Sequence, residues 1–577
     1  MSLETYISEF SKYVISIIMI LYSIQCLEAL LIKREDRRNG LYARQNILIF
    51  AFHFSCYMVI LFESKELSYL VFYVFQILIL YAVILIYKSV YKTINRLIIN
   101  NMCMLLSISF VILTRLDYVK AIKQFIIATG SLGLALVIPF FIHNLKHLKN
   151  LKWIYAIAGV FLLGLVMILG QTTYGSKISY TIVGISFQPA EFVKILFVFF
   201  VASALYESSS FFEVFSTSVI AALHIIIQVV NKDLGSALIF FVVYICMLFI
   251  GSGNVIYLIL GIFAGGGASY VAFRVFRHVQ VRVQAWKDPW SVIDSAGYQI
   301  TQSLFGISSG GYFGLGLMKG SPGSIPFVSD DFIFSALAEE FGIIFSVCLI
   351  FICLCTFLMF ISISLKLKDR FYQLIAFGLA ITYIFQVFLT IGGGTKFIPL
   401  TGVTLPLVSY GGSSLLTTII MFAIIEGLYI MTAQEKARSH ERPHGHEHKE
   451  RIPRDHKDVQ KEKIARHKEN KQKRRDKMQN LRSAEDRYSH NSHIKKAHKD
   501  EYYEDEYSED EYYEDDYYED KYYEDDYYDD EYYDEDHADG YEDEYEESRD
   551  DLDYSESIYY NEEEYEKDKR RKTNKKE

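Results

Sequence analysis

Four carboxylates stand beside a long apolar run in the stretch FVSDDFIFSALAEEFG, which begins at Phe327. Asp330 and Asp331 are adjacent, and Glu339 and Glu340 follow about two helical turns later. A carboxylate next to hydrocarbon is costly, and such residues usually indicate function. Carboxylates can exchange protons with a substrate, which makes acid–base chemistry the first reading. The alternative is that the two aspartates only cap the helix that follows them.

Two further charged positions lie at the ends of apolar runs. FQPAEFVK places Glu191 and Lys194 three residues apart, on one face of a helix. They either form a pair that neutralises itself or serve a function, because an unpaired charge there is costly. Asp233, in NKDLGSAL, falls at the same membrane level and could cap a helix or belong to a site.

The segment from Arg274 to Asp331 is richer in aromatic residues and glycines than a simple connector. Its cations include Arg274, Arg277, Arg282 and Lys287. Its glycines allow the backbone to approach a ligand closely, and its aromatic residues argue against disorder. We expect either a structural cap or part of a site. FIPLTGVTLPLVSYGGSS (397–414) is expected to be a rigid, irregular element buried in protein or lining a cavity.

Long apolar runs must position these residues. A helix needs roughly 20 mostly apolar residues to span a membrane. About thirteen runs of such length lie near residues 13–32, 46–63, 69–88, 98–114, 123–142, 153–170, 190–206, 214–230, 234–251, 254–274, 332–362, 371–392 and 411–432. The sequence therefore predicts an all-α polytopic membrane protein, with a large soluble helical bundle as the alternative. The seven cysteines lie inside these runs and are expected to be buried small apolar residues.

The end of the chain has a different composition. The whole chain is 51% hydrophobic with a formal net charge of −11, but most of its acidic residues lie after residue 500. Residues 433–500 are basic, and residues 501–577 are acidic and repeat tyrosine pairs. Opposite charge blocks with few aliphatic residues cannot bury a core, so we expect a disordered tail. It is either merely solvated or recruits a cytoplasmic partner protein; no nucleic-acid partner is expected.

Loop charge predicts the orientation, because positive side chains are retained on the cytoplasmic side. Four basic stretches fall on one side of the membrane: residues 33–45, 87–96, 143–152 and 364–370. The N-terminus is then outside and the tail is cytoplasmic. Three loops with candidate functional residues then lie outside: residues 171–189, 275–331 and 393–410.

Six motifs in order resemble the SEDS family (shape, elongation, division, sporulation), which includes FtsW, RodA and SpoVE. They are FQPAEFVK, DLGSAL, QAWKDPW, GYQITQSLFGISSGGYFGLGL, SDDFIFSALAEEFG and PLTGVTLPLVSYGGSS. The resemblance covers residues 98–432, with the large extracellular loop 275–331 inside it. It implies a core of about ten membrane helices, to which residues 1–97 add about three.

The resemblance implies a peptidoglycan glycosyltransferase of the bacterial cytoplasmic membrane that polymerises lipid II on the outer face, for cell division or elongation. A sugar hydroxyl attacks an anomeric carbon held by a diphosphate, with one inversion. Asp331 matches the family's essential carboxylate and becomes the expected general base. Two departures stand out: Asp330 replaces the usual threonine, and Ser179 or Tyr180 stands where many members have tryptophan.

The remaining site expectations rest on the charge that such a reaction needs and on the same motifs. Lys194, Arg282 and Lys287 are expected near the diphosphate, where positive charge is needed. Glu340 matches the family's second glutamate and is expected to have a structural or cation-linked role. The other residues expected to bind substrate are Glu191, Asp233 and Ser409. A divalent cation between diphosphate and carboxylates would be chemically sensible, but no ligand spacing demonstrates a metal or another cofactor.

The resemblance also suggests partners and alternatives. A class B penicillin-binding protein would crosslink the new strand, and other divisome or elongasome membrane proteins would complete the machinery. A lipid-linked precursor flippase is one alternative, because charges within the membrane and broken helices also suit transport. A scaffold that keeps the fold without activity is the other.

Overall fold

A computed structural model describes residues 3–32, 34–144, 147–173, 176–182, 185–207 and 210–441, together with residues 472, 473 and 475. The chain divides into two units, Met1–Arg451 and Ile452–Glu577. The prediction of a disordered tail was wrong for residues 433–441, which continue the last helix. Apart from residues 472, 473 and 475, the rest of the tail lies outside the described residues, and so does its predicted disorder.

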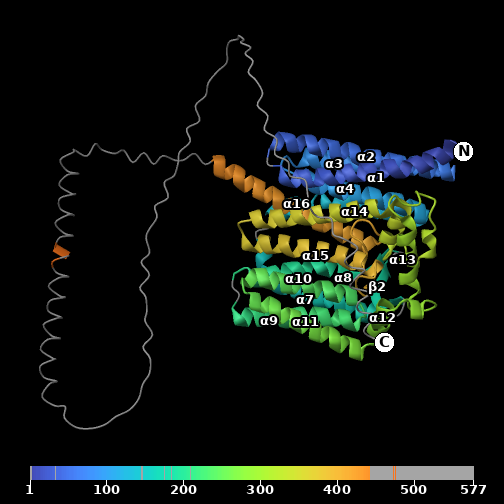
Figure 1. The fold of residues 1–577 in the computed structure, drawn as a ribbon. Coiled ribbons are helices and arrows are strands. Elements are labelled where there is room, and N and C mark those ends of the chain that lie inside the picture. Colours follow the sequence, from blue (N-terminus) through green and yellow to red (C-terminus); the bar gives the residue numbers. More distant parts are fainter. Residues whose placement is uncertain are drawn as a thin grey trace, which may run out of the picture. The chain divides into compact units, whose positions relative to one another are not determined.

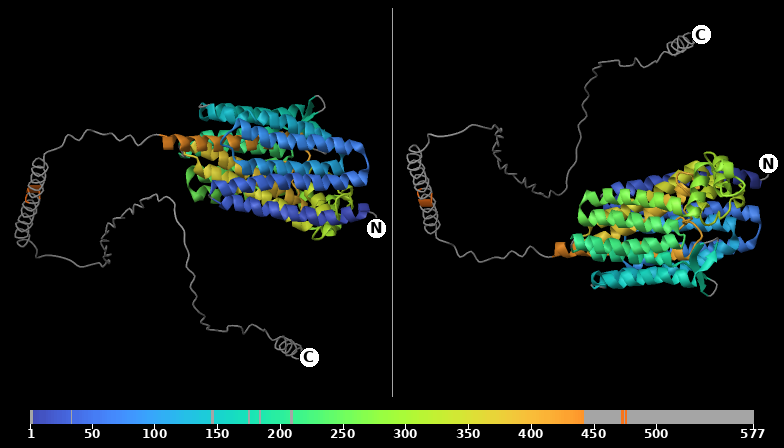
Figure 2. Two further views of the ribbon diagram at one scale, coloured as in Figure 1. Left: turned by 90° about the horizontal axis from the view of Figure 1, so that it is seen from above. Right: turned by 90° about the horizontal axis from the view of Figure 1, so that it is seen from below.

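The first unit is a bundle of long helices that run side by side (Figures 1 and 2). The helices are α1 Leu3–Leu31, α2 Glu35–Ser64, α3 Leu67–Val90, α4 Arg96–Leu116, α5 Tyr118–Ala135, α6 Ile138–Asn144, α7 Lys152–Leu169, α8 Pro189–Leu205, α9 Phe211–Val230, α10 Leu234–Ser252, α11 Val255–Val275, α12 Arg277–Lys287, α13 Tyr298–Gly310, α14 Ile333–Lys366, α15 Arg370–Gly394 and α16 Gly412–Glu441. Short 3-10 helices lie at Leu148–Asn150, Trp290–Val292 and Pro322–Ser324.

The prediction of an all-α polytopic membrane protein is confirmed. Within the described residues, twelve helices are long and apolar enough to cross a membrane, with α5 and α6 counted as one. The thirteenth predicted span, 190–206, forms α8, which at 17 residues is at the short end of the membrane-spanning range. Most side chains of α8 are buried, so it lies inside the bundle rather than at its surface.

Polar side chains fix where several of these helices begin. Each accepts a hydrogen bond from a backbone N–H in the first turn, which would otherwise lack a partner. The capping residues are Asn95, Asp117, Ser210, Asp233 and Asp369. One boundary differs from expectation: α2 begins at Glu35, inside the basic stretch 33–45 that was expected to be a loop. Its Arg, Glu, Leu and Ala residues favour helix, so the helix continues beyond the apolar run.

A small antiparallel sheet follows α7 in the expected loop 171–189. Its strands are β1 Gln171–Thr173, β2 Ser176–Ile182 and β3 Ile185–Phe187, in the order β1-β2-β3. Thr172 pairs with Lys177, and Tyr180 pairs with Phe187. The sequence expectation did not include these strands, although SKISYTI alternates polar and apolar residues as a strand does.

The irregular segments gather at one end of the bundle, which we call the loop end. It contains the sheet, residues 276–332 and residues 395–411, and α1 begins there as well (Figure 1). The short connections after α3, α6 and α14 lie at the opposite end, as does the C-terminal end of α16 (Figure 1). The three loops expected on one side of the membrane therefore do lie at one end of the bundle.

The helix α14 is interrupted close to the loop end. Gly342 has φ 84° and ψ 176°, so the helical backbone breaks there and resumes at once. Residues 311–316 lie beside the break and replace its missing bonds. The backbone pairs, donor first, are Leu315 with Glu339, Gly316 with Glu340, Ile343 with Gly311 and Ile344 with Tyr312, all at 2.9–3.2 Å.

Candidate active site

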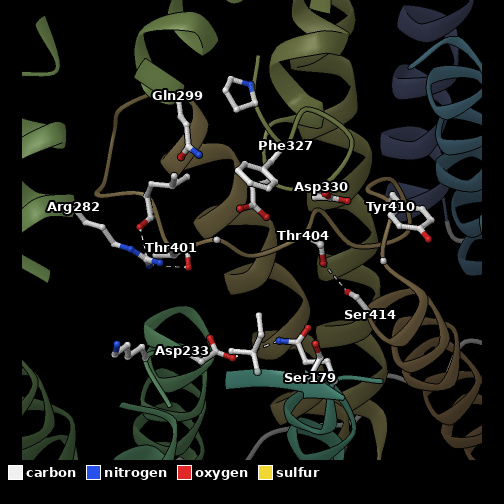
Figure 3. A pocket seen from close by; sticks show the side chains of 18 of the residues that line it. Ser179, Asp233, Arg282, Gln299, Phe327, Asp330, Thr401, Thr404, Tyr410 and Ser414 are labelled. Carbon is white, nitrogen blue, oxygen red and sulfur yellow. Dashed lines mark hydrogen bonds between the residues drawn. The ribbon is translucent and has the colours of Figure 1, made fainter. Parts of the chain in front are cut away.

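The loop end encloses a cavity of about 980 Å³. Its wall is formed by α5, β2, α12, α13, residues 326–331, residues 398–404 and the beginning of α16. Figure 3 shows Arg282 on one side of the cavity, Asp330 and Tyr410 on another, and Asp233 below them. Asp331, Asp233 and Arg282 were expected to meet from distant parts of the sequence, and all three line this cavity.

A tight turn before α14 positions the two aspartates. The backbone N–H groups of Asp330 and Asp331 both donate to the carbonyl oxygen of Phe327, at 3.0 and 3.1 Å. Phe327 has φ 57°, a left-handed conformation that is unusual for a bulky residue. Such conformations persist where the surrounding structure enforces them, often at functional sites. The turn thus presents both carboxylates to the cavity.

The carboxyl group of Asp331 has a pKa close to neutral pH. Burial raises the pKa of Asp331 to about 7, and the negative charges of Asp330 and Asp233 act in the same direction, against the opposing effect of Arg282. Among the described residues, Asp331 makes no ion pair with a cation. Gly402 approaches this carboxylate: a Cβ atom added there would lie 3.5 Å from Oδ2 of Asp331.

Asp330 has a different environment from its neighbour. Its carboxylate pairs with the Nζ of Lys120 at 3.9 Å, and that Nζ also donates to Oγ of Ser329 at 2.6 Å. The same ammonium group lies 5.2 Å from the ring centroid of Tyr410, a cation–π arrangement. Burial raises the pKa of Asp330, and Lys120 opposes that shift. The extra carboxylate of this chain therefore has its own counter-ion.

Arg282 supplies fixed positive charge to the cavity. It lies on α12, and its Nη1 donates to the carbonyl oxygens of Leu400 and Thr401, at 3.3 and 3.2 Å. Burial lowers the pKa of Arg282, and the charges of Asp233 and Asp331 raise it. A guanidinium remains protonated under such conditions. Arg282 thus holds the irregular segment in place while it faces the aspartates.

Asp233 both caps α10 and lines the cavity, so the two readings of this residue combine. Its Oδ1 accepts from the N–H of Ser236 at 3.0 Å, and its Oδ2 accepts from the hydroxyl of Ser236 at 2.8 Å. Gln188 also donates to Oδ2, at 3.5 Å. Burial raises the pKa of Asp233, and its hydrogen bonds with Ser236 oppose that rise.

Glu191 and Lys194 form a buried ion pair at 2.8 Å behind the cavity wall. Neither lines the cavity. Lys194 donates to Oε1 of Gln386 at 2.7 Å. The amide nitrogen of Gln386 then donates to the carbonyl oxygen of Thr404 and to the hydroxyl of Ser414, both of which line the cavity. The pair therefore braces the wall through Gln386.

The other three residues expected at the site lie outside the cavity lining. Glu340 is buried on α14, where its Oε1 accepts from Nε of Arg115 at 2.9 Å. Lys287 is exposed at the end of α12. Ser409 donates from Oγ to the carbonyl oxygen of Asp330 at 2.5 Å, so it holds the aspartate turn from behind.

Sequence reasoning did not single out several residues that line the cavity. Lys123, Lys232, Gln299 and Tyr410 lie in its wall, and Lys120 lies behind Asp330. The lysines 120 and 123 are spaced as neighbours on one face at the beginning of α5, and this spacing could have drawn attention to them. Ser179, one of the two residues expected at the tryptophan position of the resembled family, also lines the cavity.

A metal site is not evident in the part of the chain that the structure describes. No group of three or more His, Cys, Asp or Glu side chains there could hold an ion. The expectation of a divalent cation between diphosphate and carboxylates stays a prediction.

Comparison with known proteins identifies the family. Residues 88–434, more than half of the chain, match the sequence profile of the FtsW/RodA/SpoVE cell cycle proteins. The chain belongs to this family. The FtsW/RodA/SpoVE region begins ten residues before the predicted core and ends two residues after it. The helices α1, α2 and most of α3 precede this region.

Several relatives are named for an activity or a cellular process. The peptidoglycan glycosyltransferase RodA of Mycobacterium tuberculosis is 32% identical over 315 residues, which cover 51% of this chain and 67% of that protein. The probable peptidoglycan glycosyltransferase FtsW of Bacillus subtilis is 28% identical over 334 residues, 55% and 82% of the two chains. Stage V sporulation protein E of Bacillus subtilis is 30% identical over 304 residues, 51% and 82% of the two chains.

A solved structure has the FtsW/RodA/SpoVE-like fold of this core. It comes from work on the structural coordination of polymerization and crosslinking by a peptidoglycan synthase complex. The TM-score is 0.51 at 24% identity, with 59% of this chain and 98% of that chain covered. At this identity the likeness concerns the fold alone.

Proposed function

We propose that this protein polymerises lipid II into glycan strands on the outer face of the bacterial cytoplasmic membrane, with Asp331 as the general base. The enzyme class follows from membership of the FtsW/RodA/SpoVE family and from relatives named peptidoglycan glycosyltransferases. The observation that carries the role of Asp331 is its place in the cavity wall, without an ion partner among the described residues and with a pKa of about 7.

The chemistry needs such a base. The 4-hydroxyl of one sugar attacks the anomeric carbon of a muramyl unit, and the new C–O bond forms as the bond to the diphosphate breaks. One inversion converts the α-linked diphosphate into a β-1,4 glycoside. The hydroxyl proton passes to Asp331, whose pKa of about 7 leaves much of the carboxyl group ionised at neutral pH. The polyprenyl diphosphate departs without a strong general acid, because diphosphate is a good leaving group.

Positive charge for the leaving group comes from three cations in the cavity wall. They are Lys123, Lys232 and Arg282. Fixed cations in a site that excludes water stabilise charge that develops on the departing oxygens. Arg282 is the best placed of the three to act as a fixed group, because two carbonyl oxygens orient its guanidinium. Lys194 would contribute indirectly, through the wall that it braces.

The orientation of the bundle supports an outward-facing cavity. The short connections at the end opposite the loop end, and the helix ends beside them, carry Lys88, Lys92, Arg96, Lys149, Lys152, Lys368 and Arg370. Short basic loops are retained in the cytoplasm. We infer that this end is cytoplasmic, together with the tail, and that the loop end and the N-terminus are outside.

The partner we propose is a crosslinking enzyme, a class B penicillin-binding protein. Support comes from the fold shared with a chain studied for polymerization and crosslinking by a peptidoglycan synthase complex. A glycan strand needs crosslinking after polymerisation, which makes a transpeptidase the chemical complement of this reaction. Contacts with other divisome or elongasome proteins stay predictions.

The decisive experiment is polymerisation of purified lipid II by the full chain in detergent or nanodiscs, compared with Asp331→Asn. Loss of a general base lowers a rate by about 10² to 10⁴-fold. We expect such a loss for Asp331→Asn and a much smaller one for Asp294→Asn, an exposed carboxylate of the same loop. Glycan product that survives Asp331→Asn would remove Asp331 as the base. No product from the unsubstituted protein, even with the transpeptidase present, would favour a flippase or a scaffold.

A further inference from the structure

The helices α1, α2 and most of α3 lie ahead of the region that matches the family, and the reaction described above gives them no role. Figure 1 shows them as one layer against α4 and α14. The contacts of this layer bear on the site, because besides α4 they include α14, which follows the aspartate turn, and α5, which carries the counter-ion of Asp330.

Buried hydrogen bonds join the layer to the middle of the bundle. Tyr22 and Cys26 of α1 both donate to Oδ1 of Asn101 on α4, at 3.0 and 3.2 Å. The amide nitrogen of Asn101 then donates to the hydroxyl of Thr356 on α14 at 3.0 Å. All of these side chains are buried. Polar groups at membrane depth that satisfy one another fix the position of neighbouring helices. The layer is therefore a fixed part of the bundle.

At the loop end the layer holds the segment 311–320. Lys319 pairs with Glu63 at the end of α2, with 2.6 Å between Nζ and Oε1. Tyr13 of α1 packs against Phe313, with 5.0 Å between the ring centroids. The segment thus has an ionic contact near one end and an aromatic contact near the other, both with helices outside the family region.

The held segment in turn supports the part of α14 that follows Asp331. Residues 311–316 form four backbone hydrogen bonds with α14 around the break at Gly342. Aromatic rings also connect the two sides of the break. Phe52 of α2 stacks on Phe345, which follows the break, and Phe345 stacks on Phe341, which precedes it. The short helical segment 333–341 therefore has α1 and α2 behind it, directly or through residues 311–320.

The layer also contacts the helix that carries the counter-ion of Asp330. The hydroxyl of Tyr118, in the first turn of α5, donates to the carbonyl oxygen of Ser68 on α3 at 3.3 Å. Tyr69 and Phe72 of α3 pack on the ring of Tyr118. Lys120 follows two residues later and pairs with Asp330. The first turn of α5 is thus fixed from the side of α3.

We propose that α1–α3 are a built-in positioning element that holds the aspartate turn from two sides, through residues 311–320 and through the first turn of α5. Glu63, Lys319 and Tyr13 are positioning residues, because they touch neither the cavity nor the carboxylates. This inference rests on the proposed function for its catalytic consequence, whereas its structural part can be measured without any activity.

The test is a charge exchange at the contact between α2 and the loop. The variants are Glu63→Lys, Lys319→Glu and the double variant that restores an ion pair with reversed sign. Glu213→Lys is the matched control, because Glu213 also joins two helices through a lysine, Lys152 at 3.5 Å, but at the opposite end of the bundle. Each full-length variant is compared in nanodiscs by hydrogen–deuterium exchange and by the kinetics of lipid II polymerisation.

Each single reversal should raise amide exchange in residues 311–320 and 333–342 by about fivefold, as expected for loss of a partly exposed ion pair. It should lower kcat more than it changes KM, because the catalytic turn is disturbed rather than the overall binding surface. The double variant should restore both the amide exchange and kcat. Glu213→Lys should match the unsubstituted protein in both.

Three results would overturn the inference. The first is unchanged exchange in residues 311–320 after the single reversals. The second is faster exchange there with kcat unaffected. The third is an equal rise in amide exchange in α10 and α15, which would indicate a general loss of stability. If the unsubstituted protein makes no glycan, the proposed function fails, but the exchange comparison with its rescue still decides whether the layer positions this segment.

Discussion

Asp330 and Asp331 share one backbone turn but differ in their charge partners. Asp330 lies 3.9 Å from the ammonium group of Lys120, whereas Asp331 makes no ion pair within the described part of the chain. The two adjacent carboxylates thus differ in environment: Asp330 has a counter-ion, and Asp331 is the group that exchanges a proton in the proposed mechanism. The charge of the first also raises the pKa of the second.

The pH dependence of the reaction should report this arrangement. Because Asp331 has a pKa of about 7 and acts in its ionised form in the proposed mechanism, kcat/KM should fall about tenfold per pH unit below that value. Asp330→Asn removes the negative neighbour, which lowers the pKa of Asp331 and shifts the acid limb to lower pH. Initial rates of lipid II polymerisation from about pH 5 to pH 9 measure the shift. An acid limb at the same or a higher pH in Asp330→Asn would contradict the assignment.

The same carboxyl group should make the fold less stable at high pH. The folded pKa of Asp331, about 7, lies above the ordinary value of 3.8, so ionisation is disfavoured in the folded state. The resulting loss of stability begins above the unfolded pKa and is complete above the folded pKa. Asp331→Asn should therefore raise the Tm relative to the unsubstituted protein more at pH 8 than at pH 5. Asp294→Asn, on the exposed face of the same loop, should show no such difference.

The buried pair of Glu191 and Lys194 should behave as a unit. Removing one partner leaves an unpaired buried charge, which typically costs about 3–5 kcal/mol. Lys194→Met and Glu191→Gln should each lower the Tm strongly and loosen the wall at Thr404, while the double variant should lose less than either single change. A double-mutant cycle of thermal unfolding measures the coupling. Additive losses would show that the two charges do not depend on each other.

A side chain at Gly402 should strain the backbone beside Asp331. Its φ of 73° is disfavoured for other residues, typically by about 1–2 kcal/mol, and a Cβ atom would lie 3.5 Å from the Asp331 carboxylate. Gly402→Ala should reduce polymerisation with little change in the amount of folded protein. Gly323→Ala is the control, because a Cβ atom there meets nothing within 4 Å and its φ is not left-handed. Equal activity of the two variants would remove Gly402 from the site.

The membrane helices could be predicted from sequence because hydrophobic runs alone define them. The run 332–362, for example, became α14, Ile333–Lys366. The helices α12 and α13 could not be seen in this way, because they are short and lie in a polar, glycine-rich segment. Packing stabilises them: Ala285 of α12 and Ile300 of α13 are buried against other parts of the loop end.

The sequence predicted the carboxylates of the site, but the prediction of its cations was incomplete. Charge beside an apolar run or in a long loop drew attention to Asp331, Asp233 and Arg282, and the family motif singled out Asp331 as the base. The pairing of Lys120 with Asp330 depends on how α5 packs beside the end of the large loop, which no local pattern encodes. Lys287 was expected near the diphosphate from its charge alone, and the end of α12 instead exposes it.

The break at Gly342 has a mechanical consequence. A continuous helix transmits a tilt or a twist along its whole length, whereas a helix without its hydrogen-bond ladder at one point has a pivot there. The outer piece of α14, residues 333–341, can therefore change its angle relative to the longer inner piece. The stiffness of that pivot depends on residues 311–316, which form backbone hydrogen bonds with the helix on both sides of the break.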